Sequence, residues 1–185
     1  MKVYFARHGE YQNPDLVVPY RMPGFPLTDL GISQARLQAD KLQSLNIRDI
    51  FCSPIERCYQ TASIIGKELK LAANQNEALT ETLTPLQGIS IADHDKVIGD
   101  FPYDVPAHIE GGGETTKMIF ERMSNFIEKL KLMSKNSSHL IVSHGDPIKY
   151  YLNGVLKKEV RYIPMGGLVC LDFNQPGIPK YSEII

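Results

Sequence analysis

The sequence has no excess of charge of either sign. Its 185 residues include 20 Lys and Arg against 21 Asp and Glu, which gives a formal net charge of -1. Proteins that bind nucleic acids or anionic membranes carry basic patches that show in their composition. The charge balance therefore argues against a nucleic-acid partner and against a membrane partner.

Long apolar runs are missing as well. A helix needs about 20 consecutive apolar residues to span a bilayer, and no stretch of the chain approaches this length. The apolar run at residues 3–6 is too short for the core of a signal peptide. We therefore expect a soluble, cytoplasmic protein.

Cysteine is scarce, and its spacing suggests no pairing. The three cysteines are Cys52, Cys58 and Cys170, and no CxxC occurs. This odd count argues against a disulfide framework and against a zinc ribbon. We expect all three to be small buried apolar residues.

The composition is that of one globular domain. Hydrophobic residues make up 43% of the chain and charged residues 22%, and a chain of this size can bury about 70% of its unfolded surface around a single core. We predict one domain over residues 1–185. Residues 85–114 differ in kind, with five glycines, three prolines, six acids and one lysine, which predicts a lid-like insertion without a regular element.

Strand-like and helix-like patterns alternate along the chain. This alternation predicts an α/β fold, a three-layer α/β/α sandwich around a largely parallel central sheet. The expected strands are residues 3–6, 47–52, 139–143, 168–173 and 181–185, and the expected helices begin near residues 28, 53, 115 and 146.

Two of the expected helices have clear signals. Ser53-Pro54-Ile55-Glu56 combines an N-cap serine, a proline at the first helical position and a glutamate three residues after the cap. We expect this helix to run to about Leu69 and to bury Tyr59, Ala62, Ile65 and Leu69 or their neighbours. In the helix near residues 115–135, the apolar spacing predicts the buried positions Ile119, Met123, Phe126, Ile127 and Leu130.

Polar residues follow three of the predicted strands. They are Arg7-His8-Gly9, the segment from Ser53 to Arg57, and Ser143-His144-Gly145-Asp146. The carboxyl ends of parallel strands meet at one edge of a sheet, where ligands bind in folds of this type. We expect two histidines and two arginines to converge there.

Two guanidinium groups offer planar donors that suit a phosphate dianion. Their charge also opposes protonation of a nearby imidazole, which keeps a nitrogen lone pair available for attack on phosphorus. The glycine after each histidine lets the backbone turn close to a ligand. The predicted cleft is therefore a phosphate site.

Metal binding is the other chemistry open to His8 and His144. The sequence has no HExxH and no paired Cys/His spacing, and two nearby arginines oppose a divalent cation. It also has no GxxxxGK[ST] loop, and the run Gly111 to Gly113 favours a hinge before a helix over a nucleotide-binding loop. We expect no metal and no cofactor.

Four blocks of the sequence together resemble the histidine phosphatase superfamily, the phosphoglycerate mutase-like proteins. The blocks are residues 5–10 (FARHGE), 26–35 (PLTDLGISQA), 53–62 (SPIERCYQTA) and 142–145 (VSHG). The resemblance implies the fold of that family and a phosphohistidine intermediate on His8. It also implies that Arg7, Arg57 and His144 hold the phosphoryl oxygens.

The resemblance further implies a carboxylic acid that protonates the leaving oxygen and then activates water. Leu79-Thr80-Glu81 fits the family pattern, so Glu81 is our candidate. Glu114, before the long helix, is the rival acid. Asp93 and Asp95 are less favoured alternatives.

The sequence also departs from the family pattern. Tyr11 stands where many members have threonine, and Asn13 lies one residue before the position of the family asparagine, which is Pro14 here. The auxiliary asparagine contact to phosphate therefore depends on Asn13. We expect Gly9, Asn13, Arg21 and Gly145 to contribute to substrate binding, with Tyr11, Arg21 and Phe25 near the mouth.

The function we predict is hydrolysis of a phosphomonoester, with a small phosphorylated metabolite or phosphopeptide as substrate. Residues 82–85 lack the Arg and Tyr with which cofactor-dependent mutases hold phosphoglycerate, and the chain is short for a mutase. A phosphoglycerate-type mutase and a non-catalytic phospho-ligand binding module remain the alternatives. Either a monomer or a homodimer is compatible with the pattern.

Overall fold

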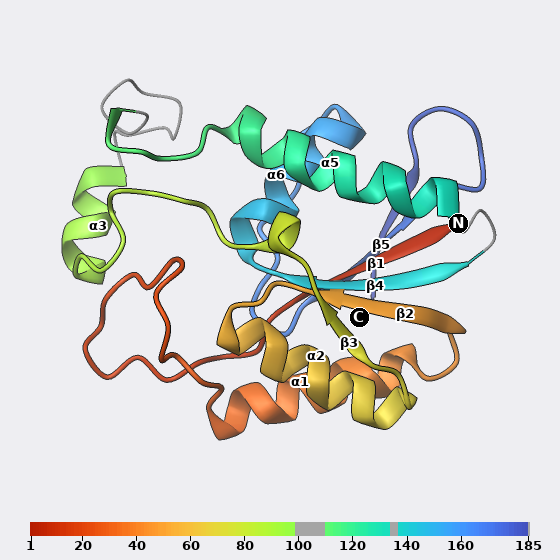
Figure 1. Ribbon diagram of the computed structural model, residues 1–185, viewed down its shortest axis with the longest axis horizontal. Helices are drawn as coiled ribbons and strands as arrows, with labels where there is room; N and C mark the ends of the chain where they lie inside the picture. Colours follow the sequence, from red (N-terminus) through yellow and green to blue (C-terminus); the bar gives the residue numbers. More distant parts are fainter. Residues whose placement is uncertain (99–109, 134–136, 185) are drawn as a thin grey trace.

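A six-stranded mixed sheet forms the centre of the computed structural model, which describes residues 1–98, 110–133 and 137–184 (Figure 1). The strand order is β3-β2-β4-β1-β5-β6. The strands are β1 (Lys2–Arg7), β2 (Ile47–Cys52), β3 (Ala73–Gln75), β4 (Ser138–Ser143), β5 (Leu168–Asp172) and β6 (Lys180–Glu183).

The four strands β1 to β4 run parallel, whereas β5 pairs antiparallel with both β1 and β6. This confirms the predicted largely parallel sheet. Ala6 of β1 and Cys52 of β2 both pair with Val142 of β4. The carboxyl ends of these three strands are therefore level, and the residues that follow them meet at one edge.

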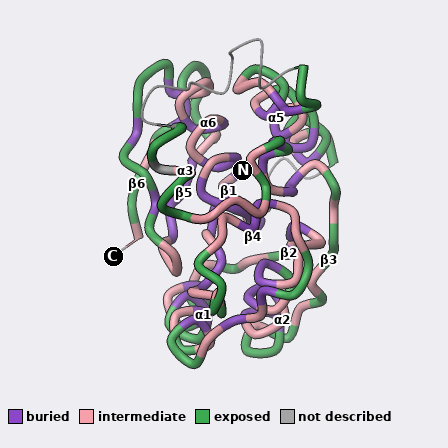
Figure 2. The backbone as a smooth tube through the Cα atoms, turned by 90° about the vertical axis from the view of Figure 1, so that its left-hand side faces the viewer, coloured by how far each residue is buried: buried purple, intermediate pink, exposed green. Residues whose placement is uncertain are grey.

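Helices cover both faces of the sheet (Figures 1 and 2). α1 (Asp29–Leu42) and α2 (Glu56–Leu69) pack together on one face, and α5 (Thr116–Met133) and α6 (Gly145–Leu156) pack together on the other. The predicted three-layer sandwich is confirmed. Among the described residues, no helix is long and apolar enough to cross a membrane.

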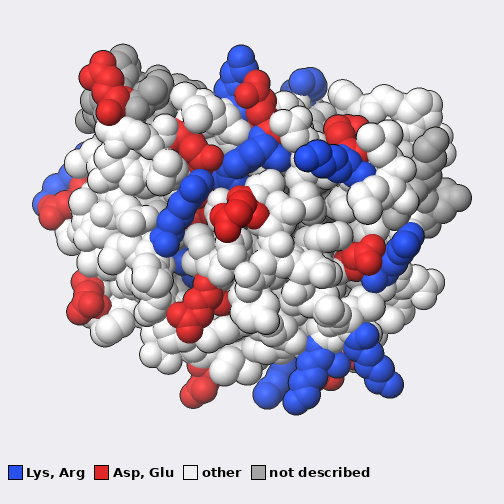
Figure 3. Space-filling model, in the orientation of Figure 1, with Lys and Arg blue, Asp and Glu red and all other residues white. Residues whose placement is uncertain are grey.

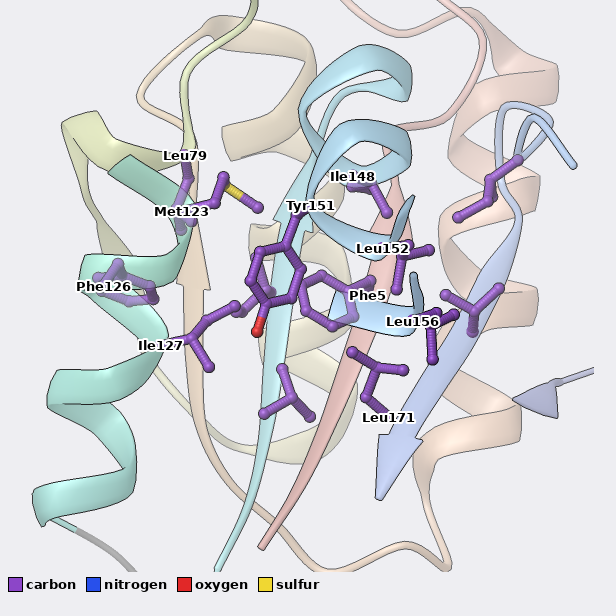
Figure 4. Close-up of a cluster of buried hydrophobic side chains, with 14 of the residues drawn as sticks. Phe5, Leu79, Met123, Phe126, Ile127, Ile148, Tyr151, Leu152, Leu156 and Leu171 are labelled. Carbon is purple, nitrogen blue, oxygen red and sulfur yellow. The ribbon is translucent and has the colours of Figure 1, made fainter. Parts of the chain in front are cut away.

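The core has two parts because successive strand side chains point to opposite faces. In β1, Val3 and Phe5 belong to the cluster under α5 and α6, while Tyr4 and Ala6 belong to the cluster under α1 and α2. The Tyr151 ring lies 5.5 Å from that of Phe5 at the centre of the first cluster (Figure 4). The buried residues of α5 are the five that the spacing predicts, and all three cysteines are free and buried as expected.

The beginning of α2 differs from the prediction. The helix starts at Glu56 with Ile55 as its N-cap, and the Ser53 hydroxyl instead accepts a hydrogen bond from the Ile55 amide, at 3.2 Å. Tyr59 is 42% exposed rather than buried. Ala62 and Ile65 are buried as predicted, and the buried face of α2 also carries Arg57 and Cys58.

The segment from residue 85 to 114 contains a helix that the sequence did not predict, α3 (Ile91–Ile98). It lies beside the loop of residues 9–28 (Figure 1), to which it is tied by a bridge between Val17 and Ser90. The Val18 amide also donates to the Ile89 carbonyl at 2.9 Å. Residues 99–109 lie outside the described part, and the lid function stays a prediction.

Candidate active site

The polar residues that follow β1, β2 and β4 surround one cavity of about 340 Å³. Its walls come from the three strand ends, from the loop of residues 9–28 and from α3. The described lining residues are Arg7, His8, Tyr11, Val18, Pro19, Tyr20, Arg57, Glu81, His94, Asp146, Tyr150 and Tyr162. The expected convergence of the strand ends is thus present.

His8 lies at the floor of the cavity and is almost fully buried. Its Nδ1 is 2.8 Å from the Gly9 carbonyl oxygen, so Nδ1 carries the proton and donates it there. This leaves the lone pair on Nε2, to which Arg57 Nε donates at 3.2 Å. Burial, and after it the Arg57 charge, lowers the pKa of His8 well below its usual value. The imidazole is therefore neutral, as predicted, although burial contributes more than the arginines.

Arg57 is buried although it belongs to the first turn of α2. Its Nη2 donates to the Tyr20 carbonyl at 2.7 Å and to His144 Nδ1 at 3.1 Å. Its Nη1 is buried and has no hydrogen-bond partner among the described residues. A buried guanidinium with an unused donor beside a neutral histidine is a site prepared for an anion.

Arg7 supplies the second guanidinium. Its Nη1 donates to the Ile163 carbonyl at 2.9 Å, and the Tyr162 ring lies 4.7 Å from its Cζ. Within the described residues, Arg7 Nε is buried and has no hydrogen-bond partner. Both arginines thus keep donors available, and both contribute to the lowered pKa of His8.

His144 is the N-cap residue of α6 and is fully buried. Because Arg57 donates to Nδ1, the proton of the neutral ring lies on Nε2, which donates to the Ser53 hydroxyl at 2.9 Å. Burial and the Arg57 charge lower the pKa of His144. Its ring centroid is 5.2 Å from that of His8. The sequence suggested Ser53 only as a helix cap, whereas the structure makes it the partner that fixes the His144 tautomer.

Glu81 follows the single 3₁₀ turn η1 (Glu77–Leu79), which comes directly after β3. Its Oε1 accepts a hydrogen bond from the Thr82 amide at 2.9 Å. Its Oε2 lies 3.5 Å from His144 Nδ1 and 3.8 Å from Arg57 Nη2. Burial, and after it the Asp146 charge, raises the pKa of Glu81 to about 7, although Arg57 opposes this. A carboxyl group of this kind can both give and take a proton near neutral pH.

Glu114, the rival acid, does not line this cavity. It forms an ion cluster with Arg21 and Arg122, each with a nitrogen 2.8 Å from the carboxylate, and it accepts the Leu83 amide at 2.9 Å. Burial alone would raise the pKa of Glu114, but the hydrogen bonds and both guanidinium charges lower it below the usual value. Glu114 is therefore a fixed anion.

The ion cluster of Arg21, Glu114 and Arg122 also supports the Glu81 backbone. Arg21 Nε donates to the Glu81 carbonyl at 2.6 Å, and Arg122 Nη1 donates to the Ala78 carbonyl at 2.7 Å. The Arg21 guanidinium is engaged behind the acid and is not among the described lining residues of the cavity, so a role in substrate binding stays a prediction. Asp93 is exposed, 3.0 Å from Lys96, and the side chain of Asp95 lies outside the described residues.

Asn13 and Gly9 are near the cavity, but their polar groups are engaged elsewhere. The Asn13 amide group exchanges hydrogen bonds with the Val17 backbone at 2.8 and 3.2 Å and does not line the cavity. The Gly9 amide donates to Thr61 Oγ1 at 3.1 Å. A Cβ at Gly9 would collide with the Gly31 carbonyl, so this glycine lets the loop after β1 approach α1. The space left by the missing Cβ of Gly9 is therefore occupied by the Gly31 backbone and not by a ligand.

Gly145 has a similar structural reason. A Cβ there would collide with the Tyr162 hydroxyl group. The glycine thus allows Tyr162 to reach over Arg7. Phe25 packs against Tyr11, with ring centroids 6.1 Å apart, and does not itself line the cavity. A role for Gly9, Asn13 or Gly145 in substrate binding stays a prediction.

The aromatic walls were largely missed from the sequence. Tyr20, Tyr150 and Tyr162 line the cavity, and no motif marked them. Asp146 also lines it, and its place directly after Ser143-His144-Gly145 was the available signal. Within the described residues, no three His, Cys, Asp or Glu side chains are grouped so that they could hold a metal ion. Figure 3 shows basic and acidic side chains interspersed over one face of the molecule.

Comparison with known proteins agrees with this geometry. The model of the histidine phosphatase superfamily, branch 1, matches residues 3–173. The chain therefore belongs to the histidine phosphatase superfamily. This confirms the resemblance on which the sequence prediction rested, and it identifies the protein as a phosphoryl-transfer enzyme of the phosphatase and mutase type.

Relatives within the family carry different names. The chain is 26% identical to phosphoserine phosphatase 1 of Hydrogenobacter thermophilus, over 80% of this chain and 73% of that protein. It is 27% identical to a probable phosphoglycerate mutase, GpmB, of Serratia proteamaculans, over 99% and 78% of the two chains. The solved structure of YhfR from Bacillus stearothermophilus has the same fold, with a TM-score of 0.84 at 18% identity, over 98% of this chain and 95% of that one.

Proposed function

We propose that the protein hydrolyses phosphomonoesters through a phosphohistidine intermediate on His8, without a metal ion. One observation supports this above all others. The Nδ1 proton of His8 is held by the Gly9 carbonyl, which leaves the Nε2 lone pair beside two buried guanidiniums with unused donors. This arrangement suits in-line attack on a bound phosphate dianion.

In the first step, His8 Nε2 forms a bond to phosphorus while the bond from phosphorus to the ester oxygen breaks. The Arg57 Nε proton, which contacts Nε2 in the free enzyme at 3.2 Å, turns to a phosphoryl oxygen. Arg7 and Arg57 neutralise the charge of the transferring group. Protonated Glu81 gives its proton to the leaving oxygen, so the product departs as an alcohol.

In the second step, water attacks the phosphorus of phospho-His8. Glu81, now a carboxylate, takes one proton from that water, and the bond between phosphorus and Nε2 breaks with its electron pair returning to the ring. Phosphate leaves, and both residues regain their initial forms. A pKa of about 7 suits Glu81 to both roles.

His144 holds a phosphoryl oxygen in this scheme. Its Nδ1 faces Arg57 and Glu81, and its orientation is maintained by Ser53 at 2.9 Å. The tautomer fixed by Ser53 keeps the proton on Nε2, and this N–H turns from the Ser53 hydroxyl to a phosphoryl oxygen when substrate binds. The buried neutral state of His144 adds no charge before substrate binds, and the Glu81 proton stays available for the leaving oxygen.

The test uses p-nitrophenyl phosphate with the wild-type protein and with His8→Ala. We expect kcat to fall by about 10⁴-fold or more in the variant, as for the loss of other enzymic nucleophiles. Phosphate should be trapped on the wild-type chain in an acid-labile, base-stable form, and vanadate should inhibit. Unfolding curves of both proteins check that the substitution leaves the fold intact.

Two results would overturn the proposal. Activity that is lost in EDTA and restored by a divalent metal excludes the metal-independent reaction. A fully active, folded His8→Ala protein excludes His8 as the nucleophile. A mutase would instead require a bisphosphate primer and would isomerise its substrate, and a binding module would show no turnover at all.

A further inference from the structure

Within the part of the chain that the structure describes, the cavity lining has cations for one phosphate only. Among its described lining residues, Arg7 and Arg57 are the two with permanent positive charge, and both lie beside His8. Arg21 does not reach the cavity because it is bound to Glu114 and to the Glu81 carbonyl. A ligand with a second phosphate or carboxylate would therefore need a cation that this lining does not offer.

The remaining charges of the lining are negative. Asp146 lines the cavity, and its charge is close enough to raise the pKa of Glu81. A second anionic group on the ligand would face this carboxylate, and like charges placed together oppose binding.

The other walls are aromatic. Four of the twelve lining residues are tyrosines, Tyr11, Tyr20, Tyr150 and Tyr162. Two of these are kept in place by their contacts. The Tyr11 ring lies 5.2 Å from Arg57 Cζ, and the Tyr20 hydroxyl is 2.7 Å from His94 Nε2. Aromatic side chains favour the face or edge of another ring.

The size of the cavity limits the ligand further. A volume of about 340 Å³ is near the lower end for small-molecule sites. The phosphate occupies the floor beside His8, so the space between the tyrosines remains for the leaving group. A compact planar ring fits this combination of room and chemistry better than an extended charged chain.

We propose that the enzyme selects monophosphate esters whose alcohol carries a small aromatic or heteroaromatic ring and no second anionic group. This inference rests on the proposed phosphatase function, because it concerns the leaving group in the same cavity. Tyr11, Tyr150 and Tyr162 contact the ring, and Asp146 disfavours a second anion. Discrimination thus comes from both an attractive and a repulsive element.

Three alkyl monoesters separate the effect of the ring from that of charge. Benzyl phosphate has a ring and no second anion, glycerol 3-phosphate has neither, and 3-phosphoglycerate has a carboxylate and no ring. All three leave as alcohols rather than as phenols, so the comparison does not depend on an activated leaving group. The measurement is kcat/KM for each ester with the wild-type protein.

We expect benzyl phosphate to exceed glycerol 3-phosphate by about threefold to tenfold, which is the usual contribution of an aromatic contact. Glycerol 3-phosphate should in turn exceed 3-phosphoglycerate by about tenfold or more, because of the carboxylates in the lining. Equal or greater use of 3-phosphoglycerate relative to benzyl phosphate overturns the proposal. Failure of all three esters, and of p-nitrophenyl phosphate, would overturn the phosphatase function itself.

A gain-of-function variant tests the charge argument directly. Val18 lines the cavity, so Val18→Lys adds a cation to the wall. We expect the ratio of kcat/KM for 3-phosphoglycerate to that for glycerol 3-phosphate to rise by about fivefold to tenfold. Leu132→Lys is the matched control. Leu132 is 80% exposed, lies near the C-terminal end of α5 and is not among the described residues that line the cavity. An unchanged ratio in Val18→Lys contradicts the charge argument.

A second variant tests the ring argument. Tyr150→Leu removes one aromatic wall and keeps an apolar side chain. The preference for benzyl phosphate over glycerol 3-phosphate should fall by about threefold, whereas kcat/KM for glycerol 3-phosphate should change less. A preference that survives unchanged in this folded variant would exclude Tyr150 as a specificity-determining residue.

Discussion

Two neighbouring regions of the molecule each hold a glutamate with little exposed surface, and the pKa values of the two glutamates are shifted in opposite directions. The regions meet at Leu83, which is two residues after Glu81. Glu81 faces the cavity, and Glu114 lies behind it in the ion cluster, where it accepts the Leu83 amide. The side chains are similarly exposed, 13% for Glu81 and 11% for Glu114. Yet the pKa of Glu81 is raised to about 7, whereas that of Glu114 is lowered.

The difference lies in the distances of the cations. Glu114 has two guanidinium nitrogens at 2.8 Å, whereas the nearest one to Glu81 is at 3.8 Å and the neighbouring carboxylate of Asp146 opposes it. Deep burial without a close cation therefore gives a titrating group at Glu81, whereas Glu114 is less deeply buried and its two close cations make it a permanent anion. A carboxyl group that titrates near neutral pH therefore requires burial and also the absence of a cation in direct contact.

The largest effect should follow from Glu81→Gln, which removes the titrating group and keeps its shape. We expect kcat for an alkyl phosphomonoester to fall by about 10² to 10⁴-fold, the usual contribution of general acid–base catalysis. With p-nitrophenyl phosphate the loss in the phosphorylation step should be smaller, because that leaving group needs no proton. Burst and steady-state kinetics measure both. An equal loss in that step for the two esters would mean that Glu81 is not the acid.

Glu114→Gln should act mainly on stability. It leaves Arg21 and Arg122 without their shared carboxylate, and we expect the free energy of unfolding to fall by about 3 kcal/mol at neutral pH. Activity should decrease less than in Glu81→Gln, because the Glu81 side chain remains. Denaturant unfolding and kcat together check this, with Glu121→Gln on the exposed side of α5 as control. A larger loss of kcat than in Glu81→Gln would reverse the assigned roles.

The two glutamates should also have opposite effects on stability as pH changes. The folded-state pKa of Glu81 is above its unfolded value of 4.5, so wild-type stability is lost as pH rises from about 4.5 to about 7. Relative to the wild type, Glu81→Gln should therefore gain on the order of 3 kcal/mol between pH 4 and pH 8.

For Glu114 the sign is reversed. Its folded-state pKa is lowered, so its contribution is present above pH 4.5 and is lost as pH falls through the folded-state value. The cost of Glu114→Gln should shrink in acid. Unfolding curves at pH 4, 6 and 8 for the three proteins measure both effects. Parallel pH dependence in the two variants would contradict the difference in their environments.

The smallest effect is expected for Arg21→Lys. Lysine keeps a charge near Glu114, but it cannot make the two directed bonds that Arg21 makes to Glu114 and to the Glu81 carbonyl. We expect kcat to fall by about twofold to fivefold. The midpoint of the pH profile of kcat should also shift, because the position of Glu81 changes when Arg21 no longer holds its carbonyl. The pH profile of kcat tests this positioning role, which a change in KM alone would contradict.

Much of the fold could be predicted because its signals are local. The strand at Ile47–Cys52 and the buried positions of α5 follow from apolar periodicity, and the level strand ends follow from parallel pairing. His8, Arg57 and His144 could likewise be placed together from motifs at strand ends, whereas Glu81 followed only from the resemblance to the family. These residues are marked by chemistry that a structural role does not require.

What could not be predicted depends on contacts distant in sequence. The burial of Arg57 in α2 was not predicted, because it is stabilised by Tyr20 and His144 rather than by neighbours in the helix. Arg21 was expected at the substrate because nothing in the sequence reveals that Glu114 approaches it across 93 residues. Polar contacts between residues far apart in the sequence are thus the features of a site that apolar periodicity does not predict.

The loop of residues 9–28 and Arg57 share one interaction. Tyr20 has a φ of 40°, a left-handed conformation that is unfavourable for a residue with a side chain, and its carbonyl accepts a hydrogen bond from Arg57 at 2.7 Å. When the loop opens locally, it must release the guanidinium and relax Tyr20 together. Anion binding at Arg57 and local opening of the loop are therefore coupled. An anion bound beside His8 would change the population of the open loop.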